Sequence, residues 1–311
     1  MLKLVDLFAG TGGFSQAFKA TGQVEVVYAN DMVPASKAIY DANNTHPLTL
    51  GNLNDIAVED IPPHDILTGG FPCQPFSIAG HQLGFEDVRS NVFWTIMKIV
   101  DARRPRAIVL ENVKNLVTHD TGKTFTTIRK ALETRGYNVT YKVLNTAKYT
   151  GIPQHRERIY IVALLDATPF SLDFPDVPKQ PLTSFYEPVV ADKYYYTDRS
   201  STWTLVSEAV VSQDTIYQYR RVYVRENKSQ ECPTLTANMG GGGHNVPLIR
   251  DAKGIRKLTP RECFNFQGFP STYILPPRLS DTDLYKLAGN AISVPIVSLV
   301  AHRLVPLLLT S

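Results

Sequence analysis

Short apolar runs alternate with amphipathic stretches along the first half of the chain. The apolar runs predict strands, and the amphipathic stretches predict helices between them; the strands are expected at residues 3–8, 25–29, 65–67, 107–110, 141–144 and 158–165, and the helices at 14–21, 35–43, 91–101 and 123–135. Strands that alternate with helices are typical of βαβ units, in which helices cover both faces of a parallel sheet. We therefore expect an α/β domain whose strand carboxyl ends share one edge, where a ligand would bind.

The pattern changes at residues 174–181, FPDVPKQP, which we interpret as a proline-rich boundary. From there to about Arg256 the chain is irregular and holds three consecutive tyrosines (194–196), clustered arginines and four consecutive glycines (240–243). This composition predicts a second, smaller domain of loops and short strands. A last helix is expected at 293–304, with Pro306 ending or kinking it.

Composition narrows the class of protein only slightly. The 311 residues are 43% hydrophobic and 20% charged, which is ordinary for a soluble enzyme, and the net charge of +3 neither supports nor excludes a nucleic-acid partner. Three widely spaced cysteines indicate neither a disulfide framework nor a zinc site, so no metal is expected. Neither a signal peptide nor a run of about 18 apolar residues is visible, so we expect a soluble, cytoplasmic protein.

A glycine-rich turn follows the first predicted strand. The segment FAGTGGF (8–14) joins strand to helix, and its glycines permit a sharp turn close to a ligand. Asp31 ends the second strand, where a carboxylate could accept hydrogen bonds from ribose hydroxyls. Ser15 takes the place of the third glycine of the dinucleotide-binding pattern. The turn alone is equally well explained as purely structural, and it does not separate NAD from S-adenosylmethionine.

A cysteine lies just beyond another predicted strand. In GGFPCQPFS (69–77), Pro72 and Pro75 restrict the backbone around Cys73, which makes its thiol a candidate nucleophile. Taken alone, a buried small apolar residue is the commoner interpretation of a free cysteine. The polar, glycine-containing residues 80–90 are typical of a loop that closes over a site.

An acid and two arginines belong to two further strands. Glu111 directly follows the strand at 107–110, at the same expected edge as Cys73, where it could donate a proton to a ring nitrogen or complement a helix dipole. Arg156 and Arg158 lie two apart, so on a strand they would share a face and could orient a carboxylate and hold a carbonyl oxygen. An isolated pair of this kind is more often two solvated charges.

Taken together, these segments resemble one family. FAGTGGF, GFPCQPFS, ENV and QHRERIY, followed by RECFNFQGFP (261–270) and GNAISVP (289–295), closely resemble the ordered motifs of DNA cytosine-5 methyltransferases. The resemblance spans residues 3–296 apart from the variable middle. It implies a Rossmann-like, S-adenosylmethionine-dependent methyltransferase fold. Residues 1–178 plus 290–311 would form the catalytic domain, 179–256 an irregular, β-rich target recognition domain, and 257–289 a bridging segment, with DNA between the domains.

The resemblance also implies a mechanism. The enzyme would flip a cytosine out of the duplex, and the Cys73 thiolate would attack C6. Glu111 would bind N3 and the exocyclic amine, Arg156 would hold O2, and Arg158 would brace Glu111. C5 would then take the methyl group of S-adenosylmethionine before the C5 proton and Cys73 leave.

The remaining site residues also follow from the resemblance. The cofactor pocket would be lined by Phe8, Gly10, Gly12, Gly13, Phe14, Asp31, Met32, Asn52, Leu53, Gly70 and Asn290. Asn52 stands where the family often has an acid for the adenine amine, so binding would be altered rather than lost. DNA contacts are expected from Arg220, Arg221, Arg225, Thr234, Thr236 and Gly241, and from Gln74, Ser77 and Gln82 in the loop after Cys73.

Other functions stay open on the sequence alone. A tRNA cytosine-5 methyltransferase would share the fold, a catalytically silent DNA-binding regulator would share the DNA surface, and a nicotinamide oxidoreductase would share only the glycine turn. The long recognition segment, with its arginines and glycines, favours double-stranded DNA over tRNA. The compact chain without regulatory domains favours a prokaryotic or phage protein paired with a restriction endonuclease, and we expect it to be a monomer. The recognised DNA sequence cannot be read from the motifs.

Overall fold

The computed structural model describes residues 1–72, 92–165, 169–240 and 245–310. Five predicted site residues therefore lie outside the described residues: Cys73, Gln74, Ser77, Gln82 and Gly241. The chain forms two compact units. The first comprises Met1–Leu144, Glu157–Phe174 and Ile296–Ser311, and the second comprises Asn145–Arg156 and Pro175–Pro295. The predicted domains differ from these units in keeping residues 145–156 and 290–295 with the catalytic domain and in treating residues 257–289 as a separate bridging segment.

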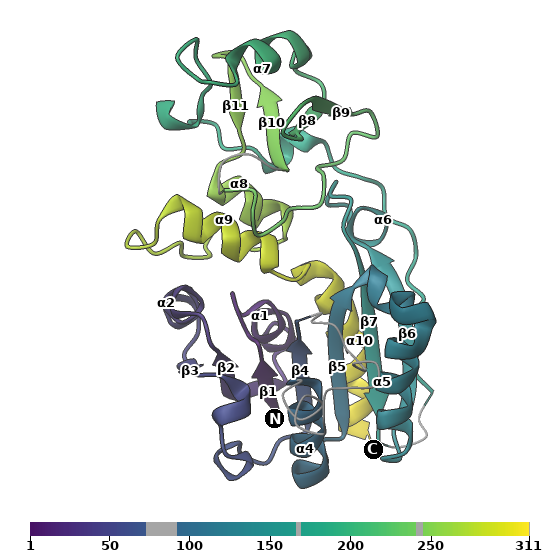
Figure 1. Ribbon diagram of the computed structural model, residues 1–311. Coiled ribbons are helices and arrows are strands. Elements are labelled where there is room, and N and C mark those ends of the chain that lie inside the picture. Colours follow the sequence, from purple (N-terminus) through teal and green to yellow (C-terminus); the bar gives the residue numbers. More distant parts are fainter. Residues whose placement is uncertain (73–91, 166–168, 241–244, 311) are drawn as a thin grey trace, which may run out of the picture. The chain divides into compact units, whose positions relative to one another are not determined.

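The first unit is built on a seven-stranded sheet in the order β3-β2-β1-β4-β5-β7-β6 (Figure 1). Its strands are β1 Leu2–Leu7, β2 Val24–Asp31, β3 Thr49–Leu50, β4 Ile66–Gly70, β5 Ala107–Val113, β6 Asn138–Asn145 and β7 Glu157–Leu164. Its helices are α1 Gly13–Lys19, α2 Pro34–Asn43, α4 Val92–Arg103, α5 Lys123–Glu133 and α10 Val294–Thr310. Each strand and helix predicted in the first half of the chain is confirmed, with ends that differ by a few residues.

Strand direction decides which residues meet at the functional edge of this sheet. β3, β2, β1, β4 and β5 are mutually parallel, as predicted, so their carboxyl ends share one edge. β7, in contrast, runs antiparallel to β5. The beginning of β7 therefore lies at the edge where β5 ends, and residues that precede or start β7 reach the ligand-binding edge.

Alternation along the strands separates a packed face from a functional face. Ile108 and Leu110 of β5 belong to the core that α4 and α5 complete, with Phe93 and Ile128 among the contributing helix residues. Successive side chains on a strand point to opposite faces. Glu111 therefore lies on the face opposite this core.

The second unit has a four-stranded antiparallel sheet in the order β11-β10-β8-β9. Its strands are β8 Ile216–Tyr219, β9 Val224–Asn227, β10 Val246–Arg250 and β11 Ile255–Lys257, and its helices are α6 Thr146–Thr150, α7 Trp203–Ala209, α8 Pro260–Phe266 and α9 Asp281–Asn290. Val206 of α7 packs on Tyr217 and Leu248 of the sheet in a small core of its own. This confirms the smaller, β-rich second part.

Two helices in this unit begin with reciprocal side-chain caps. Thr259 and Glu262 form a capping box at α8, and Ser280 and Asp283 form another at α9. Each box satisfies backbone N–H groups that have no partner within the helix. The starts of both helices are therefore fixed locally.

The C-terminal helix is longer than predicted. α10 continues through Pro306 to Thr310, so Pro306 does not end it. The buried side chains of Leu304, Val305 and Leu308 anchor its last turns. Their burial offsets the hydrogen bond that proline cannot donate. Within the described residues, no single helix is both long and apolar enough to cross a membrane; only α9 and α10 taken together, across a break, have the length and composition.

Candidate active site

Glu111 and Arg158 form an ion pair at the edge where β5 ends. Arg158 Nε lies 3.2 Å from Glu111 Oε1. Across β5 and β7, Glu111 is opposite Tyr160 and Val113 is opposite Arg158, so the two charged residues are diagonal neighbours on one face. Both side chains are largely buried, with 11% of Glu111 and 16% of Arg158 exposed. Charge-assisted pairing in such a place fixes the direction of the carboxylate.

The segment that leads to Cys73 is tied to the same place. Gly70, the last residue of β4, pairs with Glu111 of β5. The buried side chain of Asn112 donates from Nδ2 to the carbonyl of Phe71 (3.0 Å) and accepts the Val113 N–H at Oδ1 (2.8 Å). The chain is thus held beside Glu111 two residues before Cys73. Asn112 was not singled out from the sequence, although it is the middle residue of the ENV motif.

The glycine turn after β1 uses backbone conformations that favour glycine. Gly10 and Gly12 have φ angles of 53° and 73°, and Phe8 has a φ of 54°. A Cβ on Gly12 would lie 3.0 Å from the Tyr40 ring, so close packing as well as backbone strain requires glycine there. Gly13 and Phe14, both buried, begin α1.

A network of buried polar side chains connects the strand before this turn with the helix after it. Asp6 Oδ2 accepts hydrogen bonds from the backbone N–H (3.1 Å) and Oγ (2.7 Å) of Ser15, and Asp6 Oδ1 accepts one from Thr68 Oγ1 (2.9 Å). Burial raises the pKa of Asp6 to about 6, although these donors act in the opposite direction. Ser15, which replaces the third glycine of the sequence pattern, therefore anchors α1 to β1 and β4. Neither Asp6 nor Thr68 was among the predicted site residues.

Asp31 lies at the carboxyl end of β2 beside the turn. Its Oδ2 accepts the Gly10 N–H (2.9 Å) and its Oδ1 accepts the Val33 N–H (2.8 Å). Burial raises its pKa above the ordinary value, while these hydrogen bonds oppose the shift. A Cβ built on Gly10 would make ordinary van der Waals contacts with Phe8 O (3.8 Å) and Asp31 Oδ2 (3.9 Å), so the positive φ rather than crowding favours glycine there. The neighbouring Met32 side chain is 65% exposed.

These features fit an adenosine-containing methyl donor. A fixed carboxylate matches ribose hydroxyls, the missing side chain of Gly10 lets a ligand approach the backbone, and an exposed thioether offers an apolar contact for a base. Asn52 caps a short 3-10 helix by accepting the Asn54 N–H at Oδ1 (3.1 Å), and its side chain is exposed. Leu53 beside it is buried.

Arg156 occupies a different setting from Arg158. β7 begins at Glu157, so Arg156 precedes the strand and the expectation that it shares a strand face with Arg158 does not apply. Its guanidinium donates to the carbonyls of Leu235 (3.0 Å), Gly289 (3.3 Å) and Ala291 (2.7 Å), all in the second unit. Only 2% of Arg156 is exposed.

The candidate DNA arginines lie on the β8–β9 hairpin of the second unit. Arg220 and Arg221 occupy its exposed turn, and Arg225 is exposed on β9 opposite Gln218. Arg221 has a φ of 66°, and Val222 beside it is 82% exposed. A strained, solvent-exposed turn with two cationic side chains is suited to binding a polyanion.

The other predicted DNA contacts lie on the segment after Cys232. The Thr234 hydroxyl donates to the carbonyl of His155, and Thr236 Oγ1 donates to Asn238 Oδ1 (2.7 Å). Leu235 between them is fully buried. Asn290, predicted to contact the cofactor, is the exposed last residue of α9.

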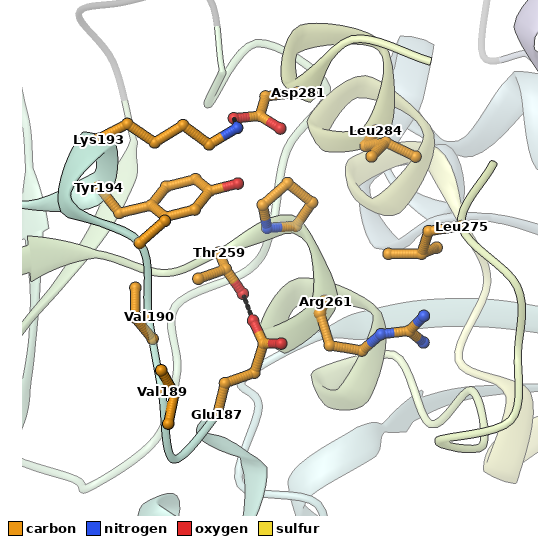
Figure 2. A pocket seen from close by; sticks show the side chains of 12 residues that line it. Glu187, Val189, Val190, Lys193, Tyr194, Thr259, Arg261, Leu275, Asp281 and Leu284 are labelled. Carbon is orange, nitrogen blue, oxygen red and sulfur yellow. Dashed lines mark hydrogen bonds and ion pairs between the residues drawn. The ribbon is translucent and has the colours of Figure 1, made fainter. Parts of the chain in front are cut away.

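A pocket of about 330 Å³ in the second unit is separate from these residues (Figure 2). On its wall Lys193 pairs with Asp281 (2.6 Å), and the Thr259 hydroxyl donates to the Glu187 carboxylate. These polar groups satisfy one another, and the predicted catalytic and cofactor residues do not line the pocket. Across the part of the chain that the structure describes, no group of three or more His, Cys, Asp or Glu residues is placed to hold a metal ion.

Sequence comparisons indicate one family for this chain, and a structural comparison indicates the fold. The family model for C-5 cytosine-specific DNA methylase matches residues 2–305. The type II methyltransferase M.Bsp6I of Bacillus sp. (strain RFL6) is 48% identical over 98% of both chains, and M.HaeII of Haemophilus aegyptius is 38% identical over 97% of this chain and 92% of its own. The crystal structure of S. pombe Dnmt2 methyltransferase, 22% identical, superimposes with a TM-score of 0.81 over 99% of both chains, which shows a shared fold. Matched over nearly its whole length, the chain belongs to the C-5 cytosine-specific DNA methylases.

Proposed function

We propose that this protein transfers a methyl group from S-adenosylmethionine to C5 of a cytosine within a specific double-stranded DNA sequence. The observation that carries the proposal is the Glu111–Arg158 pair, 3.2 Å apart, beside the tethered backbone that leads to Cys73. A carboxyl group held in a fixed direction can polarise a pyrimidine ring for attack by a thiolate.

The chemistry follows from the electronic structure of cytosine. C5 is a poor nucleophile while the ring is aromatic, so the Cys73 thiolate adds to C6 as the protonated Glu111 carboxyl group donates its proton to N3 and accepts a hydrogen bond from the exocyclic amine. The C6–S bond forms, and the electron pair of the C5–C6 double bond becomes available at C5. C5 would then take the methyl group of the donor as the S–CH3 bond breaks and a neutral sulfide leaves. Loss of the C5 proton and cleavage of the C6–S bond restore the ring and the thiolate.

Arg158 contributes by holding Glu111. An ion pair fixes one carboxylate oxygen and leaves the other for the ring. Because C5 and C6 of a paired cytosine are inaccessible inside the duplex, the base must leave the stack, at a cost of a few kcal/mol. The exposed Arg220 and Arg221 would supply contacts with phosphates or guanine edges that offset this cost.

Binding of the methyl donor rests on the turn after β1. The bound donor supplies an electrophilic methyl group. Asp31 would accept the ribose hydroxyls, Gly10 would let the ligand approach the backbone, and Met32 would lie against the adenine. Asn52 Oδ1 already accepts one N–H and has a second lone pair for the adenine amine.

A restriction-modification setting is part of the proposal. The relatives M.Bsp6I and M.HaeII are named type II methyltransferases. A monomer acting in the cytoplasm would protect one DNA sequence against an endonuclease that cuts the same sequence. Bisulfite sequencing of DNA from cells that express this chain would identify the sequence and the modified cytosine.

The nucleophile has a direct test. DNA that contains 5-fluorocytosine cannot lose its C5 substituent as a proton, so it should trap a covalent complex. Cys73→Ser should abolish the complex, whereas Cys263→Ala, which changes a buried thiol whose pKa burial raises, should retain it. An undiminished complex in Cys73→Ser would exclude Cys73.

The substrate has a separate test. Transfer of radiolabelled methyl groups should occur on plasmid or phage duplex DNA and not on tRNA. Activity confined to tRNA would overturn the choice of DNA while leaving the ring chemistry unchanged.

A further inference from the structure

Arg156 is a buried cation whose guanidinium donates to three backbone carbonyls. Nη1 donates to Leu235 O, and Nη2 donates to Gly289 O and Ala291 O. A buried charge is tolerated only when hydrogen bonds replace its hydration, and three peptide oxygens do so here. The planar fork of a guanidinium can reach carbonyls from two chain segments at once, which a lysine ammonium does less well.

The first of these segments carries candidate DNA contacts. We call residues 232–237 the recognition segment. Its Cys232 accepts the His155 N–H (2.9 Å) and donates its own N–H to Pro153 O (2.6 Å), and Thr234 donates to His155 O. Residues 153–155, just before Arg156, are therefore hydrogen-bonded to the recognition segment, and the Arg156 side chain adds a hydrogen bond to Leu235 O.

The second segment, residues 288–291, is the last turn of α9 together with its C-cap residue Ala291. Gln267 Nε2 donates to Ala288 O (2.6 Å), and Gln154 Nε2 donates to Gln267 Oε1 (3.2 Å), so a chain of buried amides also holds this turn. This turn includes Asn290, which is expected to contact the cofactor.

The two segments touch through their backbones. A Cβ built on Gly289 would lie 2.2 Å from Thr236 C and 2.4 Å from Ala237 N. No side chain fits between them. Arg156 thus spans a junction that is already in direct contact, and its loss would leave three buried carbonyls without this donor.

From this arrangement we infer that Arg156 is a positioning residue that fixes the recognition segment against the turn carrying Asn290. It acts on DNA and cofactor binding through the backbone and does not hold the reacting base. The inference rests on the proposed function, because it takes Thr234 and Thr236 as DNA contacts and Asn290 as a cofactor contact. It gives Arg156 a task different from the contact with O2 that the sequence resemblance implies.

Two variants disturb the junction by independent routes. Arg156→Lys keeps the charge but loses the fork, and Gly289→Ala leaves Arg156 in place and forces the two backbones apart. Arg261→Lys is the matched control, since Arg261 is a partly buried arginine of the same unit that donates to Tyr273 O, away from both segments. Circular dichroism verifies that each variant is folded.

The measurements separate positioning from catalysis. Anisotropy gives the dissociation constant for a fluorescent duplex that contains the methylated sequence, and calorimetry gives that for S-adenosylhomocysteine. Both constants should rise on the order of tenfold in Arg156→Lys and in Gly289→Ala, as expected for lost buried hydrogen bonds. KM for DNA and for S-adenosylmethionine should rise in parallel, with kcat at saturation nearly unchanged. Arg261→Lys should match the wild type.

Two results would overturn the inference. The first is a large loss of kcat in Arg156→Lys with both dissociation constants unchanged, which would place Arg156 on the reacting base. The second is wild-type binding in both junction variants. If the wild-type protein transferred no methyl group to DNA, the proposed function would fail, whereas the dissociation constant for S-adenosylhomocysteine would still decide whether Arg156 positions the turn that carries Asn290. Should Arg156→Lys not fold, Gly289→Ala carries the test alone.

Discussion

Asp6→Asn should remove a pH dependence that the wild-type protein carries in the stability of its first unit. Asp6 is fully buried, and desolvation raises its pKa from 3.8 to about 6 despite hydrogen bonds from Ser15 and Thr68. Each unit of pKa shift corresponds to about 1.4 kcal/mol, so ionised Asp6 costs about 3 kcal/mol of unfolding free energy.

The sign of the effect follows from proton binding. Between pH 3.8 and about 6 the folded state holds the Asp6 proton more tightly than the unfolded state does. The favourable contribution of neutral Asp6 is therefore complete below pH 3.8 and is lost as the pH rises through 6. As the pH rises from 4 to 7, the unfolding free energy of Asp6→Asn should increase by about 3 kcal/mol relative to that of the wild type.

Urea unfolding measured across this pH range tests the prediction. In a Trp203→Phe background, fluorescence of Trp94 on α4 reports on the first unit. Thr68→Val is an informative companion, because it removes a hydrogen bond that favours the carboxylate and should move the transition to higher pH. A difference between Asp6→Asn and wild type that stays constant from pH 4 to pH 7 would refute the reasoning.

Three further changes have defined outcomes. Glu111→Gln should lower kcat about 10²–10⁴-fold in a radiolabel assay while duplex binding by anisotropy persists; an unchanged kcat would remove Glu111 from the chemistry. Asp31→Asn should raise the calorimetric dissociation constant of S-adenosylhomocysteine on the order of tenfold, and an unchanged value would contradict the assigned ribose contact. Gly268→Ala should lower the unfolding free energy by more than Gly22→Ala in urea titrations. Both glycines have positive φ, but only at Gly268 would the Cβ collide, 2.3 Å from Pro295 Cδ, and equal losses would show that this collision is relieved.

Local pattern predicted much of the first unit but not the way the candidate catalytic residues Glu111 and Arg158 meet. Apolar runs identify β1, β2, β4 and β5, and the rule for parallel strands places Glu111 at the same edge as the Cys73 segment. Periodicity carries no information on the direction of β7. A parallel β7 would begin at the opposite edge and take Arg158 away from Glu111. Before the structure, only the family resemblance predicted that Arg158 contacts Glu111.

Arg156 shows a second limit of sequence reasoning. Two arginines separated by one residue imply equal roles on one strand face, yet the strand begins between them, at Glu157. The partners of Arg156 are carbonyls of residues 235, 289 and 291, which are far away in sequence. Backbone oxygens have no residue identity, so no motif could reveal this contact.

The chain passes between its two units four times, after Leu144, Arg156, Phe174 and Pro295. Neither unit is therefore a continuous cassette that a single recombination event could exchange. Transplanting residues 175–295 from a relative would leave the host's own residues 145–156 to bond with a foreign recognition segment. We expect new DNA specificities in this lineage to arise by substitution within exposed loops such as the β8–β9 turn, and engineered chimaeras to function only when both pieces come from the same parent.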